Sequence, residues 1–193
     1  TALYCVTTAF WIYAKGIAHA VLGDVERAAR MQSALDEAHA SIPDGRVIFN
    51  NEAEDIIAIA VAMLAGELDY RRADYETAFA HLRHAVHLYD ALSYSEPWSW
   101  MQPPRHALGA LLLEQDRVEE AFAVYRADLG LDDTLVRPSQ HPANVWSLHG
   151  YAECCARLGE TGEHARASES LAEASVIADV PIRASCLCRV GVS

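Results

Sequence analysis

The stretch Arg105-His106-Ala107-Leu108-Gly109-Ala110-Leu111-Leu112, followed after a short polar turn by Val118-Glu119-Glu120-Ala121-Phe122-Ala123-Val124-Tyr125, decides the fold. Both segments have a helical pattern. Gly109 in the first segment is followed twelve positions later by Ala121 in the second. Two antiparallel helices can cross closely only where neither carries bulk, so this pair of small residues predicts a helix crossing.

The same pairing recurs along the chain. The other pairs are Gly16 with Ala28, Gly66 with Ala78 and, more weakly, Ala152 with His164. Each pair spans a short turn; the four turns are Leu22-Gly23-Asp24, Arg72-Ala73-Asp74, Gln115-Asp116-Arg117 and Leu158-Gly159-Glu160. We therefore predict one helical-repeat domain over residues 1–193, with units at about 4–40, 52–92, 103–130 and 144–178 and a tail over 179–193.

The connections between the units carry proline and polar turn residues, which end helices. They are Ser41–Asn51, Ser93–Pro104 and Leu131–Ala143. Composition agrees with a helical protein, because alanine supplies 34 of the 193 residues whereas valine and isoleucine together supply 23. The predicted fold class is all-α without a β-sheet.

The formal net charge of -12 opposes binding to the phosphate backbone of nucleic acids or to an anionic membrane. No apolar run is long enough to span a bilayer, and the first residues do not have the pattern of a secretion signal. The five cysteines are odd in number and include adjacent pairs, which is a poor disulfide framework and favours a cytoplasmic location.

The spacing of the small residues resembles that of the tetratricopeptide repeat. Leu108, Gly109, Ala121 and Tyr125 match the family template, whereas Arg105 replaces its opening tryptophan. The units recur every 43–50 residues instead of 34, because the connections are longer. The resemblance implies an all-α, right-handed solenoid of about four antiparallel helix pairs that acts as a scaffold for protein–protein interaction.

A narrower resemblance rests on the connections and the helices that follow them. The stretches from Glu96 to Gly109 and from His141 to Gly150 are similar to the C-terminal half of a family of long microbial tetratricopeptide-repeat proteins. The sequence starts without methionine and enters a helical pattern at once, so we expect it to be a fragment of a longer chain. This resemblance implies no particular activity.

The first helix of each repeat lines the concave face of such a solenoid, and its outward positions are the candidate ligand-binding groove. The candidates are Met63, Glu67, Tyr70, Arg71, Arg105, His106, Trp146, His149, Glu153 and Arg157. The expected ligand is a peptide, a protein partner or another part of the parent chain. The first helix offers apolar residues instead, among them Phe10, Trp11 and Tyr13, which predicts contact with preceding repeats or self-association.

A second hypothesis is a metal-dependent enzyme. His106 and His149 occupy the same position in successive repeats, and Glu153 lies one helical turn after His149. Two histidines and a carboxylate could bind a divalent metal such as zinc, with Glu67 or Glu153 as ligand or general base. The alternative for both histidines is an ordinary polar residue of the groove. The sequence has no phosphate-binding loop, nucleophile elbow or His-Glu-x-x-His helix, so a scaffold without cofactor remains the main prediction.

Two further clusters have structural and functional interpretations. Cys154-Cys155 and Cys186-Leu187-Cys188 could supply thiolates to a metal or form a redox pair, but neither has the spacing of known zinc or thioredoxin-like sites. We interpret these cysteines as small buried residues. Trp98 and Trp100 could hold a ligand, but the prolines beside them favour a role in covering the apolar seam between repeats.

Overall fold

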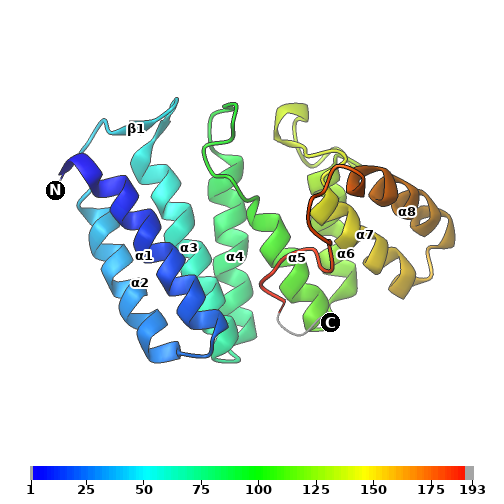
Figure 1. Cartoon of the computed structure of the whole chain (residues 1–193), viewed down its shortest axis with the longest axis horizontal. Helices are drawn as coiled ribbons and strands as arrows, with labels where there is room; N and C mark the ends of the chain where they lie inside the picture. Colours follow the sequence, from blue (N-terminus) through cyan, green and yellow to red (C-terminus); the bar gives the residue numbers. More distant parts are fainter. Residues whose placement is uncertain (1, 190–193) are drawn as a thin grey trace. The chain divides into compact units, whose positions relative to one another are not determined.

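The structure is a computed structural model that describes residues 2–189. Residues 190–193 of the predicted tail lie outside the described part. The described residues are mainly helical (Figure 1). The α-helices are α1 (Cys5–Val21), α2 (Val25–Ala40), α3 (Ala53–Arg71), α4 (Tyr75–Asp90), α5 (Pro104–Glu114), α6 (Val118–Leu129), α7 (Val145–Leu158) and α8 (Thr161–Ser175). Two short 3-10 helices, η1 (Ala2–Tyr4) and η2 (Arg137–Ser139), complete the helical elements of this range. The fold class is all-α, as predicted.

One small β-hairpin departs from the prediction. In the connection between α2 and α3, β1 (Val47–Ile48) pairs antiparallel with β2 (Asn51–Glu52). Phe49 lies at the tip with a φ of 56°, in the left-handed region that a tight reversal of the chain uses. The expectation of a chain without any sheet was wrong at this connection, because a two-residue pairing leaves no periodicity that a sequence pattern can reveal.

The chain divides into two compact units, which we describe separately. Unit 1 covers residues 1–104 and holds α1 to α4, and unit 2 covers residues 105–193 and holds α6 to α8 with nearly all of α5. In unit 1, α1 packs on α2 and α3, and α3 packs on α4. In unit 2, α7 packs on both α6 and α8.

The four short turns between paired helices share one backbone conformation. Their central residues are Gly23, Ala73, Asp116 and Gly159, and all four have a positive φ of 60–79°. In each turn the next backbone N–H donates to a carbonyl five residues earlier, as from Asp24 to His19 at 2.9 Å. This is a helix C-terminus closed by a left-handed residue, which explains why two of the four positions are glycine.

The small residues in unit 1 mark close helix contacts. A Cβ atom placed on Gly66 would lie 3.2 Å from the carbonyl oxygen of Ala78 and 2.7 Å from Cγ of Leu82, so α3 and α4 meet where the sequence predicts. Gly16 differs, because its nearest neighbour is Leu64 of α3 at 2.5 Å and not its predicted partner Ala28. The small residue of α1 therefore makes room for the next helix pair.

The connection before α5 folds back onto α1. Trp100 is buried, and its ring lies 6.0 Å from that of Phe10 and 5.3 Å from that of Tyr13, measured between centroids. Burial raises the pKa of the Tyr13 hydroxyl, and the charge of Glu67 raises it further. Trp11 on the same helix stays 59% exposed. Part of the apolar surface predicted to need an external partner is thus covered within unit 1.

Among the described residues, no helix is both long enough and apolar enough to cross a membrane.

Candidate functional site

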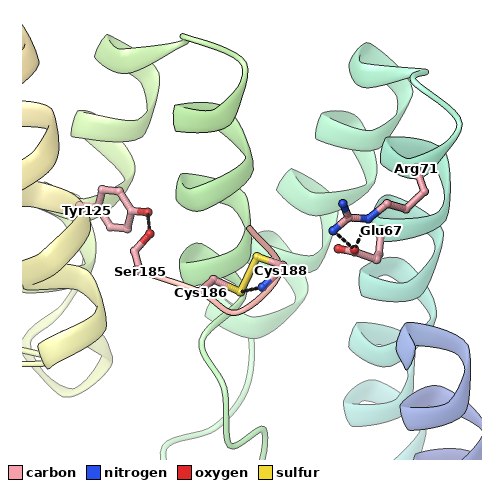
Figure 2. Close-up of a disulfide and its surroundings, with 6 residues drawn as sticks. All are labelled: Glu67, Arg71, Tyr125, Ser185, Cys186 and Cys188. Carbon is pink, nitrogen blue, oxygen red and sulfur yellow. Dashed lines mark hydrogen bonds and ion pairs between the residues drawn. A yellow bond between two sulfur atoms is a disulfide. The ribbon is translucent and has the colours of Figure 1, made fainter. Parts of the chain in front are cut away.

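In unit 1, the candidate groove residues belong largely to the packed interior. Met63, Glu67 and Tyr70 are each buried, with exposed fractions of 4–5%. The Tyr70 ring lies edge-on to Tyr75 at 5.1 Å, so this side chain packs between α3 and α4. Arg71 donates from Nε to Oε1 of Glu67 at 2.8 Å (Figure 2). These contacts leave Met63 and Tyr70 little surface for a ligand.

In unit 2, the candidates Arg105 and His106 of α5 are also buried. The Nε2 atom of His106 lies 3.3 Å from Oδ2 of Asp128 on α6. Asp128 contacts two further side chains: Nδ1 of His141 lies 2.8 Å from Oδ1, and Ser147 donates to Oδ2 at 2.5 Å. One fully buried carboxylate therefore links α5, α6, the following connection and α7.

The Asp128 carboxylate stays ionised in this environment. Burial alone would raise the pKa of Asp128, but hydrogen bonds from His106 and His141 and their charges outweigh it and hold the pKa below its usual value. All four side chains of the cluster are nearly excluded from solvent, so a substrate has no access to them. The cluster is a structural link between helices. His106, which the metal hypothesis requires as a ligand, is already in contact with Asp128.

The other candidates of unit 2 lie on α7. Trp146 and His149 are half-buried, and Nδ1 of His149 is a buried atom without a hydrogen-bond partner. Desolvation lowers the pKa of His149, and the nearby Arg189 lowers it further against the opposing charge of Glu153. Arg157 donates to the carbonyl oxygen of Leu113 at 3.0 Å and to Glu153 at 3.3 Å. His149, Glu153 and Arg157 are spaced four apart and share one face of α7.

This face of α7 is in contact with a segment of the chain's own C-terminal region. After α8 the chain continues without helix or strand and runs back toward the start of unit 2 (Figure 1). We call residues 176–189 the return segment. Nη1 and Nη2 of Arg189 donate to the two carboxylate oxygens of Glu153 at 2.7 and 3.2 Å. Burial alone would lower the pKa of Arg189, but the hydrogen bond and charge of Glu153 raise it above the ordinary value.

A second contact holds the return segment at Ser185. The hydroxyl groups of Ser185 and Tyr125 lie 2.5 Å apart, and both residues are completely buried (Figure 2). Burial raises the pKa of Tyr125, so its hydroxyl keeps its proton and either oxygen can donate. The flanking Ala184 and Cys186 are buried as well, whereas Leu187 is 81% exposed.

Two glycines allow Tyr125 of α6 to reach the return segment. A Cβ atom on Gly109 of α5 or on Gly150 of α7 would overlap the end of the tyrosine ring, which therefore lies against both helices. α5 and α6 do approach each other at Gly109, as predicted. The residue of α6 that contacts Gly109 is Tyr125, however, and not the predicted Ala121, which lies one turn earlier. The Tyr125 hydroxyl, His149 and Glu153 form what we call the Tyr125–Glu153 surface.

The cysteines differ from the prediction in one respect. Cys186 and Cys188 form a disulfide, with Cα atoms 5.2 Å apart, and the N–H of Cys188 donates to Sγ of Cys186 at 3.2 Å (Figure 2). The sequence argument against disulfides was wrong here, because a turn at Leu187 brings two cysteines of the same short segment together. Cys154 and Cys155 are free and buried, and desolvation raises the pKa of Cys154 to about 12 and also raises that of Cys155. Such thiols are poor nucleophiles at neutral pH.

The described residues contain no group of three or more histidine, cysteine, aspartate or glutamate side chains arranged to hold a metal ion. His106 contacts Asp128, and Glu153 contacts Arg157 and Arg189. The zinc site at His106, His149 and Glu153 therefore stays a prediction that these contacts do not favour.

Each unit also has a hollow in its described surface. In unit 2, a groove of about 470 Å³ has an apolar wall that includes Leu129, Leu148 and Tyr151, and charged groups at Arg126, Glu163 and Arg166. Tyr151 donates to Glu163, and Arg126 also contacts Glu163, so these charges satisfy one another. In unit 1, a cleft of about 380 Å³ lies among Lys15, His19, Arg27, Arg30 and Met31.

Comparisons with known proteins give no relative to guide the assignment. No family model matches the chain, and neither the curated proteins nor the solved structures include a significant match. The function must therefore be argued from the site alone.

Sequence reasoning missed Tyr125, Ser185 and Arg189 as residues of the candidate site, and Asp128 as a structural one. Tyr125 matches the repeat template, but nothing in the sequence indicates that its hydroxyl reaches a partner 60 residues away. The acidic residue in the apolar α6 pattern was the available signal for Asp128, because a buried charge requires partners.

Proposed function

We propose that the chain is a tetratricopeptide-like scaffold, a right-handed solenoid of four helix pairs, which binds a short peptide segment at the Tyr125–Glu153 surface. The segment comes from a partner protein or from another part of the parent chain. One observation carries the proposal: this surface already holds a segment without regular secondary structure, through the hydroxyl contact at Ser185 and the ion pair at Arg189.

Three further observations support the proposed scaffold and its ligand. The four turns with a left-handed central residue repeat as expected for successive helix pairs. The net charge of -12 disfavours a nucleic acid or an anionic membrane as partner. The Tyr125–Glu153 surface offers a neutral hydroxyl and a carboxylate, which are groups that recognise polar and cationic side chains. The proposal includes a cytoplasmic location, which the free thiols of Cys5, Cys154 and Cys155 favour and the Cys186–Cys188 disulfide opposes.

The test requires a chain whose return segment has left the surface. In a Ser185→Asp/Arg189→Glu variant, a carboxylate would have to enter a buried site and a second one would face Glu153, so the segment should be released. Release is measured as faster trypsin cleavage after Arg183, because Ala184 and Ser185 are buried in the parent chain and resist the protease. Arg183→Glu cannot be used in the trypsin assay, because it removes the cleavage site. It is a matched control for the binding assay, because Arg183 is exposed and its replacement should leave the return segment in place.

Binding is then measured by fluorescence anisotropy with a labelled, oxidised peptide of residues 180–189. The released variant should bind the peptide, whereas the parent chain and Arg183→Glu should bind it far more weakly. In those two chains the tethered segment competes at a millimolar effective concentration. A released variant that folds but does not bind the peptide contradicts the proposal.

A further inference from the structure

The proposed function leaves open which peptides the Tyr125–Glu153 surface accepts. The return segment answers this question, because its contacts differ sharply from one position to the next. Residues 184–186 are buried, Leu187 points away from the protein with 81% of its surface exposed, and Arg189 is again partly buried. We propose that this surface recognises a serine between two small residues, followed four positions later by an arginine, and that the return segment occupies the site as an internal competitor. The inference rests on the proposed function.

The serine position selects for both size and chemistry. Ser185 has no exposed surface, and its neighbours Ala184 and Cys186 are small and buried. A larger side chain at any of these positions would have to displace packed atoms. The Tyr125 hydroxyl is buried too, so a ligand that lacks a hydroxyl leaves it without the partner that Ser185 provides at 2.5 Å.

The arginine position selects for a planar cation. Glu153 receives two hydrogen bonds from two different nitrogens of Arg189, a paired geometry that lysine cannot reproduce with a single ammonium group. Other charges also face this position. Arg157 lies 3.3 Å from Glu153, and Glu114 and Glu153 both raise the pKa of Arg189. The acidic pair Glu114 and Glu153 thus favours a cation here although Arg157 is close.

The exposed residues of the segment carry little specificity. Leu187 between the two anchors is exposed, and so is Arg183 before Ala184. Cys188 is half-buried and is joined to Cys186 by the disulfide, which fixes the turn at Leu187. The recognised pattern is therefore small-Ser-Cys, one unspecified residue, Cys and then Arg, with the two cysteines in a disulfide. A partner that carries this pattern must displace the return segment, so binding in trans is limited by release of the chain's own copy.

The experiment exchanges charges between peptide and protein. The Ser185→Asp/Arg189→Glu chain is titrated with four labelled peptides of residues 180–189: the native sequence, Ser185→Ala, Arg189→Lys and Arg189→Glu. Loss of the hydroxyl should weaken binding about tenfold. The Arg189→Lys peptide loses the paired hydrogen bonds and should also bind more weakly than the native peptide. The Arg189→Glu peptide reverses the charge and should bind more weakly by on the order of a hundredfold or more.

Compensating variants test the contacts themselves. Glu153→Arg is added to a Ser185→Asp/Arg189→Ala chain, whose own segment cannot re-form the ion pair with residue 153. In this chain the Arg189→Glu peptide should become the better ligand. When Tyr125→Phe is added to the Ser185→Asp/Arg189→Glu chain, the native and Ser185→Ala peptides should bind equally. If Glu153→Arg does not fold, the nearly isosteric Glu153→Gln should abolish the preference for arginine over lysine. Far-ultraviolet circular dichroism and the unfolding midpoint establish that each chain is folded.

The outcomes separate this inference from the proposed function. If all four peptides bind with equal affinity, the surface binds peptides but the serine and arginine rule is wrong. If no peptide binds a folded and released chain, the proposed function fails and the inference with it. Reversal of preference by Glu153→Arg is the result expected from the inference.

Discussion

In each unit a segment without regular secondary structure covers packed helices, but the contacts that hold it differ. In unit 1, Trp100 lies on Phe10 and Tyr13 of α1, and the contact is made by three aromatic rings. In unit 2, the return segment contacts α6 and α7 through two hydroxyl groups and one ion pair, and only the small side chains Ala184 and Cys186 add apolar burial. A buried apolar contact can be replaced only by another apolar surface, because water does not bind apolar groups favourably. A polar contact can be replaced by hydrogen bonds to water or to a ligand. We therefore expect the cover of unit 1 to be structural, and we propose that the cover of unit 2 is exchangeable.

Removal of the aromatic cover should produce the largest effect. Trp100→Ala deletes a buried indole ring that contacts two other rings, and it should destabilise the protein by about 3–5 kcal/mol, as other truncations of buried aromatic residues do. The measurement is the free energy of unfolding in urea. Trp11→Ala is the matched control: its ring is 59% exposed and it should cost less than about 1 kcal/mol. Equal losses for the two variants would show that burial of Trp100 on α1 is not what stabilises unit 1.

The sequence predicted the helices better than it predicted the site. Turns such as Leu22-Gly23-Asp24 and the prolines before α5 have local signatures, because left-handed residues and proline restrict the backbone directly. The hairpin at residues 47–52 has no such signature. The groove positions depend on how each helix is rotated about its axis, which packing decides. Tyr70 was placed outward by the repeat template, but its ring packs on α4.

Long-range contacts explain why the site itself was missed. The return segment has neither helical nor strand periodicity, so its sequence predicts no position in the fold. Its contacts join Ser185 to Tyr125 and Arg189 to Glu153, over 60 and 36 residues. The disulfide between Cys186 and Cys188 belongs to the same segment. Glu153 was identified as a candidate for its place on α7, but its arginine partner could be found only from the structure.

An intermediate effect is expected where Tyr125 passes the two glycines of unit 2. Gly109→Leu places a bulky side chain where the tyrosine ring lies, and it should destabilise the protein by about 1–3 kcal/mol through overpacking. The displaced ring should also release Ser185, so trypsin should cleave faster after Arg183. Gly162→Ala is the control, because the only atom near its Cβ position is a flexible nitrogen of Arg166 at 3.8 Å. Unchanged stability in Gly109→Leu would contradict the crossing at this residue.

The smallest effect concerns the turns, where the two units should behave alike. Each unit has one turn with glycine and one with another residue at the left-handed position: Gly23 and Ala73 in unit 1, and Gly159 and Asp116 in unit 2. An alanine in this conformation costs roughly 1–2 kcal/mol relative to the right-handed one, and glycine avoids that cost but loses more entropy on folding. Ala73→Gly should therefore stabilise the protein by about 0.5–1 kcal/mol, and Gly23→Ala and Gly159→Ala should each destabilise it by a similar amount. The free energy of unfolding of each variant is measured in urea. Ala80→Gly, at an exposed position of α4, is the control. Glycine inside a helix should destabilise the protein there by about 1 kcal/mol. If Ala73→Gly loses as much stability as Ala80→Gly, Ala73 does not have the left-handed conformation that the four turns share.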